Sequence, residues 1–188
     1  HVHMLRGRYS AILAGVGTVI ADDPLLICRI PGGRNPVRVI ADTFLRTPLE
    51  SQIVRTAGDI STIIATSSDD ARRIRQYTDS GCHVMKLPSN EGHISLKALV
   101  SKLGNDGIDS ILAECGGTLA WSLFREGIVN KVYAYIAPKI FGGSEALTPV
   151  EGPGVGDPSS SFILKNSRVR KFGNDFMIES EVDQCSQG

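Results

Sequence analysis

Two adjacent carboxylates, Asp22 and Asp23, stand directly before Pro24 and shortly after a glycine-containing stretch. A carboxylate can take part in proton transfer or stabilise a cation that develops during a reaction. The same pair also fits a turn in which one aspartate caps backbone N–H groups ahead of the proline, and taken alone the turn is the favoured interpretation. The two aspartates alone therefore do not indicate a catalytic site, and other polar residues are needed to support one.

A diglycine lies between a predicted strand and a predicted helix, in the sequence ECGGT at residues 114–118. Backbone without side chains can approach a phosphate at a helix N-terminus, where Thr118 would cap the helix or donate its hydroxyl. A tight strand-to-helix turn with an ordinary cap is the commoner explanation of a diglycine. Neither a G-x-G-x-x-G nor a P-loop motif is present.

Other polar residues lie near the paired acids or follow a predicted strand. Thr43 and Arg46 come after a strand that ends at Asp42, and a hydroxyl with a guanidinium suits a nucleotide 2′-phosphate, although a turn with a surface arginine is the commoner case. The histidines and cysteines match no zinc-ligand spacing, so no metal is expected. Arginines with forked donors could clamp an anionic substrate, although scattered arginines are usually solvated: Arg6, Arg8, Arg29 and Arg34.

Composition limits the class of protein. The chain has 188 residues, of which 41% are apolar and 21% charged, and its formal net charge is zero. Such a chain folds as a globular unit and has no overall field for nucleic acid or anionic lipid. No apolar stretch approaches the roughly 20 residues that span a bilayer, so we expect a cytoplasmic protein with no membrane partner. The widely spaced cysteines are expected to be reduced thiols: Cys28, Cys82, Cys115 and Cys185.

Alternating strand and helix patterns must position these residues. Short apolar runs predict strands over residues 9–15, 36–42, 61–68, 83–87, 110–114 and 131–138, with a turn at 15–18. Apolar spacing predicts helices over 68–81, with Ser68 as N-cap, and within 95–107 and 118–127. A loop is expected at 140–161, followed by a hairpin about 172–175. Repeated β-α units then predict one three-layer α/β domain over residues 1–188, with a mainly parallel mixed sheet and a C-terminal antiparallel hairpin.

Four sequence blocks stand in order along the chain: residues 5–26 (LRGRYSAILAGVGTVIADDPLL), 35–48 (NPVRVIADTFLRTP), 111–143 (ILAECGGTLAWSLFREGIVNKVYAYIAPKIFGG) and 173–179 (GNDFMIE). Together they resemble the reductase domain of bacterial riboflavin-biosynthesis proteins. The resemblance spans nearly the whole chain. It implies a dihydrofolate-reductase-like fold and the NADPH-dependent reduction of 5-amino-6-(5-phosphoribosylamino)uracil to its ribitylamino product.

The resemblance also implies roles for individual residues. Asp22 would assist proton transfer or stabilise the cation while hydride reaches C1 of the opened ribosylamine, and Arg29 with Arg6 would bind the 5′-phosphate. The implied substrate contacts are Arg6, Leu26, Arg29 and Glu114. The implied cofactor contacts are Thr18, Asp22, Thr43, Gly116, Gly117, Thr118, Leu119, Ala120, Trp121 and Ser122.

Family members usually carry a first strand, with a substrate-contacting lysine, ahead of the segment around Arg6, and this chain is expected to lack that strand. A deaminase domain, often fused upstream in the family, is outside the chain, so a fused or separate deaminase is an expected partner. The resemblance also implies a homodimer. Two other functions stay open, a related reductase of a pterin- or folate-like substrate and a non-catalytic nucleotide-binding module.

Overall fold

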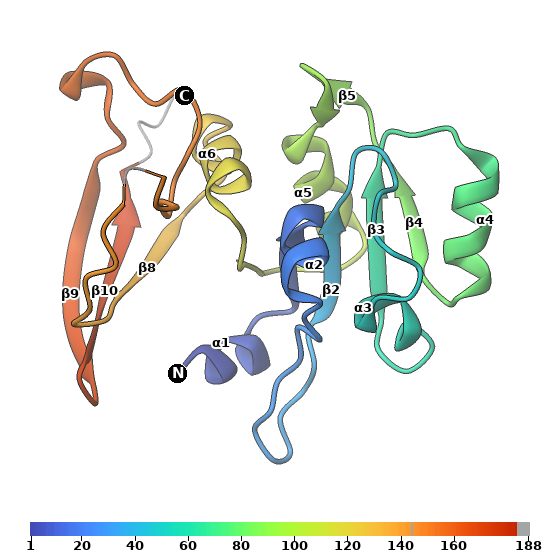
Figure 1. Cartoon of the computed structure of the whole chain (residues 1–188), viewed down its shortest axis with the longest axis horizontal. Helices are drawn as coiled ribbons and strands as arrows, with labels where there is room; N and C mark the ends of the chain where they lie inside the picture. The colour runs from blue at the N-terminus through green and yellow to red at the C-terminus, as the bar shows by residue number, and fades with distance from the viewer. Residues whose placement is uncertain (144, 184–188) are drawn as a thin grey trace. The chain divides into compact units, whose positions relative to one another are not determined.

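The computed structural model describes residues 1–143 and 145–183, and the chain forms two compact units. We call His1–Gly116 the N-terminal unit and Gly117–Gly188 the C-terminal unit. Each unit builds its own main sheet, parallel in the first and antiparallel in the second (Figure 1).

The N-terminal unit contains a five-stranded parallel sheet. Its strands are β1 (Ala11–Gly15), β2 (Val37–Ala41), β3 (Thr62–Thr66), β4 (His83–Lys86) and β7 (Ile111–Ala113). They lie in the order β4-β3-β2-β1-β7, and every neighbouring pair is parallel. β-branched and small apolar residues dominate these strands, which suits a sheet buried on both faces. The mainly parallel sheet predicted from the sequence is therefore confirmed.

One helix precedes the first strand of this unit, and the other helices lie between its strands. The helices are α1 (Val2–Arg8), α2 (Val16–Asp22), α3 (Gln52–Arg55), α4 (Ala71–Asp79) and α5 (Leu96–Asn105), and a short antiparallel pair, β5 (Ser89–Asn90) and β6 (His93–Ile94), precedes α5. The chain steps from β1 to β4 in one direction and then crosses back to β7 beside β1. Right-handed connections therefore place α2, α3 and α4 on one face and α5 on the other, which makes three layers.

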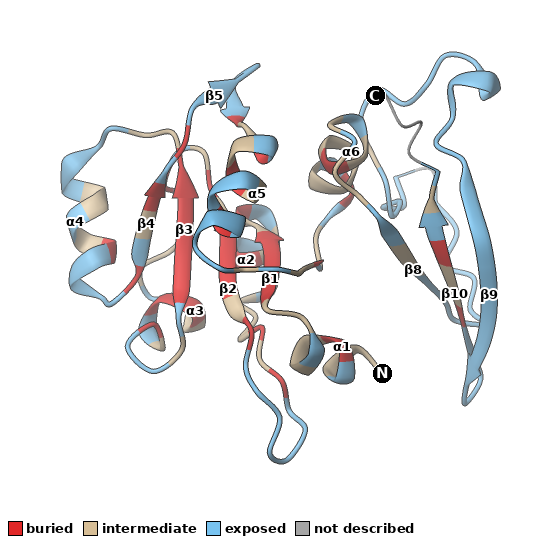
Figure 2. Ribbon diagram, turned by 180° about the vertical axis from the view of Figure 1, so that it is seen from behind, coloured by how far each residue is buried: buried red, intermediate tan, exposed pale blue. Residues whose placement is uncertain are grey.

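The main core of this unit lies between the sheet and the layer of α2, α3 and α4. Ile12, Ile40 and Ile64 come from three adjacent strands and point to this face, where they join Ile53 of α3 and Tyr77 of α4 in one buried cluster. All five side chains are fully buried, as Figure 2 shows for the strands. Burying an isoleucine side chain stabilises the fold by ~1.5–3 kcal/mol.

A buried arginine ties the elements on this face together. Arg38 of β2 lies on the same face as Ile40, and its side chain is fully buried. Burial lowers its pKa to about 10. Every guanidinium nitrogen donates at 2.5–3.3 Å, to the carbonyls of Leu25, Ile53 and Ile60 and the hydroxyls of Thr56 and Thr62.

The C-terminal unit begins with a helix and continues into an antiparallel sheet. Its elements are α6 (Gly117–Arg125), β8 (Lys131–Ile136), the 3₁₀ helix η1 (Pro158–Ser160), β9 (Leu164–Phe172) and β10 (Asp175–Val182). The strands lie in the order β8-β10-β9, and β9 and β10 form the predicted hairpin. Phe162 packs against Trp121 and Phe124 of α6, with ring centroids 5.9 and 5.2 Å apart.

The predicted turn at residues 15–18 is wrong, because Val16 begins α2 directly after β1. Val16 and Val19 are three residues apart and both are buried. Burial of this apolar face outweighs the cost of Gly17 inside a helix, ~1 kcal/mol. A helix of seven residues contains too few positions to reveal its period in the sequence.

The predicted N-cap of α4 is also wrong by two residues. The Asp70 carboxylate, not the Ser68 hydroxyl, accepts a hydrogen bond from Arg73 N at 3.0 Å. Ser68 instead accepts from Asp70 N at 3.2 Å and so supports the capping residue. Among the described cysteines, Cys28, Cys82 and Cys115 are free, as predicted, whereas Cys185 lies outside the described residues.

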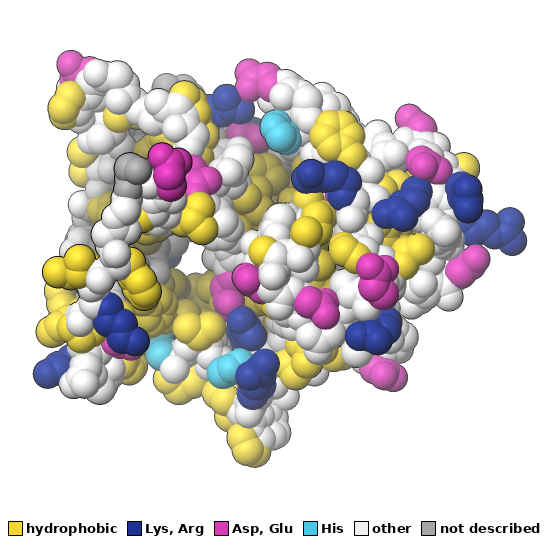
Figure 3. All heavy atoms as spheres, viewed as in Figure 1, with side chains coloured by type: hydrophobic (Ala, Val, Ile, Leu, Met, Phe, Trp, Pro, Cys, Tyr) yellow, Lys and Arg dark blue, Asp and Glu magenta, His cyan; other side chains and the backbone are white. Residues whose placement is uncertain are grey.

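The surface carries mixed charge. On the face drawn in Figure 3, basic and acidic side chains are interspersed over the N-terminal unit, in agreement with the zero net charge. Among the described residues, no helix has the length and apolar character needed to cross a bilayer. In the same part of the chain, no three His, Cys, Asp or Glu side chains gather into a metal site.

Candidate cofactor and substrate site

The carboxyl ends of the parallel strands bring the start of α2, Thr43 and Glu114 to one edge of the sheet. Gly15 ends β1 and pairs with Ala41 of β2, two residues before Thr43. Glu114 follows β7 and continues the ladder, since its N–H donates to Leu13 O at 2.9 Å. The chain reverses its direction of winding between β1 and β7, and open α/β sheets bind ligands beyond such a reversal.

Helix α2 carries Thr18 in its first turn, next to this edge, and Asp22 in its last turn. Its N-cap, Gly15, is extended (φ −84°, ψ 152°), and its buried face carries Val16 and Val19. Thr18 and Asp22 are four residues apart and therefore lie on the same face of the helix, one turn from each other. Asp22 is exposed and Thr18 is partly exposed, so both side chains can reach a ligand.

The segment after α2 is tightly folded. Asp23 is left-handed (φ 40°, ψ 55°), and its carboxylate accepts a hydrogen bond from Gln52 N at 2.7 Å. Asp23 thus caps a backbone N–H group, as the turn interpretation expects of one aspartate, but this N–H group belongs to α3 and not to a local turn. Leu26 is also left-handed (φ 51°), and its side chain is buried in the main core. A substrate contact at Leu26 would therefore come from its backbone.

Arg6 and Glu114 form a paired unit at the same edge. Arg6 Nε and Nη2 donate to the two carboxylate oxygens of Glu114 at 2.9 and 2.6 Å, and Nη1 donates to Ile27 O at 3.2 Å. The hydrogen bonds to Glu114 raise the pKa of Arg6. Arg29, in contrast, is exposed and contacts His3 through its backbone N–H, at 3.3 Å from Nδ1. The two predicted phosphate-binding arginines thus stand in different electrostatic surroundings.

Asp42 and Thr43 follow β2 and make different hydrogen bonds. The Asp42 carboxylate is buried and accepts from Arg46 N, Thr47 N and Thr47 Oγ1 at 2.7–2.9 Å, which fixes the loop. Thr43 O accepts from the hydroxyl of Thr66, at 2.9 Å, and Thr43 Oγ1 accepts from Ile94 N at 3.2 Å. The Thr43 hydroxyl thus keeps its hydrogen for another acceptor.

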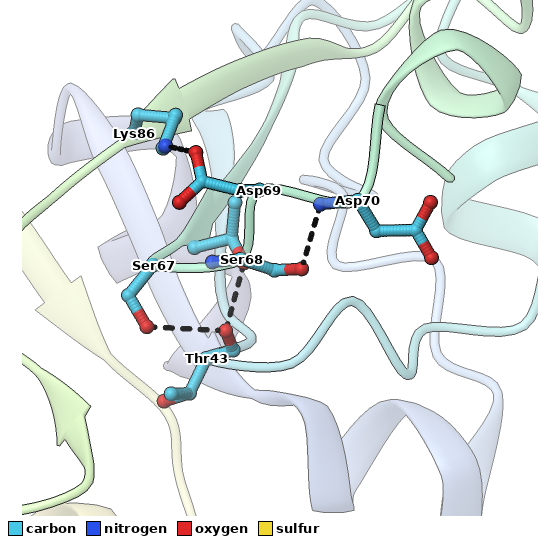
Figure 4. Close-up of polar contacts among 7 residues, drawn as sticks. Thr43, Ser67, Ser68, Asp69, Asp70 and Lys86 are labelled. Carbon is cyan, nitrogen blue, oxygen red and sulfur yellow. Dashed lines mark hydrogen bonds and ion pairs between the residues drawn. The ribbon is translucent and has the colours of Figure 1, made fainter. Parts of the chain in front are cut away.

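Beyond β3 and β4, polar side chains extend this edge. Figure 4 shows Ser67 beside Thr43, with the Ser67 hydroxyl 3.4 Å from Thr43 O. Lys86 at the end of β4 forms an ion pair with Asp69. Isolated serines and lysines carry no signal in the sequence before the strand order is known, so these residues were not predicted.

In the C-terminal unit, the start of α6 contacts a loop of the same unit. Glu151 N donates to Gly117 O at 3.1 Å, and Thr118 Oγ1 donates to a Glu151 carboxylate oxygen at 3.1 Å. A Cβ at position 117 would lie 2.8 Å from Glu151 N, so only glycine fits there. A Cβ at Gly116 would meet nothing within 4 Å. The diglycine thus combines one residue that a loop requires with one that leaves open space.

Groups that suit a phosphate-containing dinucleotide occur in each of the two units, taken separately. Gly17 and Gly116 leave open space beside the backbone, and Thr43 retains a hydroxyl hydrogen. Trp121 lies in the predicted cofactor segment, and its Nε1 is a buried donor without an acceptor among the described residues. Backbone approach and uncommitted donors are what phosphate and amide groups of a nucleotide require.

Polar groups gathered at the carboxyl edge of a doubly wound parallel sheet define the class of nucleotide-binding α/β proteins. Within that class, the chain belongs to the RibD C-terminal domain family, whose sequence model matches residues 1–178. The resemblance drawn from the four sequence blocks is therefore confirmed.

Two relatives illustrate the range of the family. Riboflavin biosynthesis protein RibD of Actinobacillus pleuropneumoniae is 42% identical over 181 residues, which cover 96% of this chain and 48% of that protein. The chain thus spans about half the length of this relative. The 2,5-diamino-6-ribosylamino-4(3H)-pyrimidinone 5′-phosphate reductase of Methanothermobacter thermautotrophicus is 33% identical over 185 residues, which cover 96% of this chain and 83% of that protein.

Solved structures agree with the fold. A Thermotoga maritima diaminohydroxyphosphoribosylaminopyrimidine deaminase/5-amino-6-(5-phosphoribosylamino)uracil reductase superposes with a TM-score of 0.78 at 28% identity, over 96% of this chain and 47% of that chain. Acinetobacter baumannii RibD reaches a TM-score of 0.83 at 24% identity, over 97% of this chain and 49% of that chain. The dihydrofolate-reductase-like fold expected from the sequence is confirmed.

Proposed function

We propose that this chain is an oxidoreductase that uses NADPH to reduce 5-amino-6-(5-phosphoribosylamino)uracil to its ribitylamino product in riboflavin biosynthesis. One observation carries the proposal: Thr18, Thr43 and Glu114, which lie far apart in sequence, meet at one edge of the parallel sheet. Membership of the RibD C-terminal domain family and the names of the two relatives support a reductase of riboflavin biosynthesis, and the second relative is named for the 2,5-diamino-pyrimidinone phosphate rather than for the uracil.

The reaction needs a cation that accepts hydride. The ribosylamine opens when its C1–O bond breaks and the ring oxygen takes a proton from solvent, which leaves a C1=N iminium and a hydroxyl group. A bound nicotinamide would supply hydride to C1. The electron pair of the C=N bond then returns to nitrogen and gives the ribitylamine. We assign proton transfer or stabilisation of the cation to Asp22, whose exposed carboxylate stands on the helix after β1.

Substrate recognition divides between a paired and an exposed arginine. Glu114 is held by Arg6, and its remaining lone pairs can accept N–H groups of the pyrimidine. Arg29 is exposed, so its guanidinium is available to the 5′-phosphate as a forked donor. Leu26 contributes through its backbone.

For the cofactor, we propose contacts from Thr18, Asp22, Thr43 and the segment from Gly116 to Ser122. Arg46 is exposed three residues after Thr43 and would select NADPH over NADH through the 2′-phosphate. Arg46→Ala should therefore raise the KM for NADPH and leave the KM for NADH unchanged. An equal effect on both cofactors would remove Arg46 from the 2′-phosphate site.

The domain organisation, oligomeric state, location and partner of the chain are proposed from its family. Residues 1–188 act as a single reductase domain, work as a homodimer in the cytoplasm, and receive their substrate from a fused or separate deaminase. Size-exclusion chromatography with light scattering tests the dimer directly, since a mass near 20.2 kDa would indicate a monomer.

The experiment that tests the function supplies freshly generated phosphoribosylaminouracil to the purified chain with NADPH. NADPH oxidation coupled to ribityl product is the expected result. NADPH binding without oxidation would favour a non-catalytic nucleotide-binding module, and turnover of a pterin or folate analogue alone would favour a related reductase.

A further inference from the structure

We propose that Gln52 is a positioning residue for the reaction, which acts through Asp23 on the direction of the Asp22 carboxylate. The inference rests on the proposed function, because Asp22 has its assigned role only in that reaction. The observation behind it is a reciprocal contact between the residue next to Asp22 and a helix that contributes nothing else to the site.

Gln52 and Asp23 hold each other through two hydrogen bonds. The Gln52 side-chain amide Nε2 donates to Asp23 O at 2.5 Å, and Gln52 N donates to the Asp23 carboxylate at 2.7 Å. Ser51, the N-cap residue of α3, makes no side-chain cap, and its buried Oγ has no partner among the described residues. The Asp23 carboxylate therefore caps α3 in place of Ser51, and the Gln52 side chain donates a hydrogen bond to the Asp23 backbone.

This contact acts where the chain leaves α2. Asp23 N donates to Val19 O at 3.1 Å, so Asp23 closes the last turn of the helix in which Asp22 stands. The left-handed backbone of Asp23 is one that a residue with a Cβ adopts only when its surroundings hold it. Because Asp22 is exposed, the backbone at its C-terminal side decides where its carboxylate points.

Other contacts hold the far end of the same segment. Arg38 Nη1 donates to Leu25 O at 3.3 Å, the Leu26 side chain is buried in the core, and Cys28 N donates to Asn35 Oδ1 at 3.0 Å. Gln52 holds the end next to Asp22. Loss of the Gln52 side chain should thus free the Asp22 end while the far end stays anchored.

The first test is kinetic. Gln52→Ala removes the Nε2 donor but keeps the backbone N–H that Asp23 caps. Displacing a catalytic group by ~1 Å can cost ~10²-fold, so we expect kcat to fall about ten- to a hundredfold with both KM values within about twofold. Gln52→Glu keeps the size but replaces the donor with an acceptor, and should lose at least as much. Arg55→Ala, an exposed change in the same helix, is the matched control and should keep wild-type kcat.

The second test does not need turnover. Amide hydrogen exchange at Asp23 N should accelerate about tenfold in Gln52→Ala and Gln52→Glu, because the last turn of α2 opens more often, and should not change in Arg55→Ala. Unchanged exchange at Asp23 in both variants would overturn the inference, and so would a wild-type kcat in an active enzyme. A wild-type chain that binds NADPH without oxidising it would instead contradict the proposed function, and the exchange result would still decide whether Gln52 anchors the segment.

Discussion

The ion pair between Arg6 and Glu114 makes a quantitative prediction about how the substrate edge is held together. It joins α1 to the end of β7 through two hydrogen bonds of 2.9 and 2.6 Å. The side chains are only 15% and 26% exposed, so solvent screens the pair weakly. Hydrogen bonds to charged groups contribute ~1.5–3 kcal/mol each, and desolvation offsets much of this sum. We expect a coupling free energy of about 1–3 kcal/mol.

The two single variants should lose different amounts of unfolding free energy, with the larger loss for Arg6→Met. Glu114→Gln keeps the shape, one acceptor oxygen and the bond from Arg6 to Ile27 O, so the free energy of unfolding should fall by ~1–2 kcal/mol. Arg6→Met removes all three bonds and leaves the Glu114 carboxylate partly buried without its cation, which should cost ~3 kcal/mol. The double variant should lose less than the sum of the two single losses, by the coupling free energy.

Urea unfolding, followed by circular dichroism, measures the free energy of unfolding of the wild type, the two single variants and the double variant. Equal m-values check that all four unfold in two states. Half-molar salt should leave most of the coupling in place, because both side chains are largely withdrawn from solvent. A coupling free energy below ~0.5 kcal/mol, which is the ordinary error of additivity, would refute the claim that this pair ties α1 to the sheet.

Further predictions concern the reaction, the core and the loop at α6. Asp22→Asn should lower kcat by ~10²-fold or more, with a much smaller effect on NADPH affinity, and an unaltered kcat would exclude Asp22 from the chemistry. Arg29→Ala should raise the KM for the phosphorylated substrate about tenfold, and an equal loss with a dephosphorylated analogue would contradict a phosphate contact. Arg38→Met should reduce the free energy of unfolding by ~2–4 kcal/mol, because buried carbonyls lose their donor. A smaller loss measured by urea unfolding would contradict this role of Arg38. Glu151→Gln should tighten NADPH binding up to about fivefold in a fluorescence titration, since a carboxylate beside the predicted diphosphate segment repels it by ~1 kcal/mol, whereas weaker binding would oppose that location.

Sequence patterns were enough for the elements whose apolar residues fill whole strands. Val39 and Ile40, or Ile63 and Ile64, are adjacent apolar residues that both become buried, as a strand covered on two faces requires. The closing hairpin was equally clear, since its turn includes Gly173 with a positive φ of 61°. The family resemblance then assigned the proposed site residues by their place in the motifs, and these assignments stay predictions.

The contacts that organise the site could not be predicted in this way. Arg38 sits in a strand pattern where a charged residue reads as a solvent-facing position, and only the fold supplies five acceptors around it. Gln52 and Asp23 are 29 residues apart, and no local spacing joins them. Glu151 lies in a loop without a period, so its contact with Gly117 depends on the path of that loop. Each of these contacts joins distant segments, which sequence periodicity does not encode.

The most direct test of the central claim follows NADPH absorbance while the purified chain receives freshly generated 5-amino-6-(5-phosphoribosylamino)uracil, with the product identified by mass spectrometry. We predict that one NADPH is oxidised for each ribitylamino product, and that Asp22→Asn suppresses this oxidation while it still binds NADPH. NADPH binding by the wild-type chain with no ribitylamino product would contradict the account.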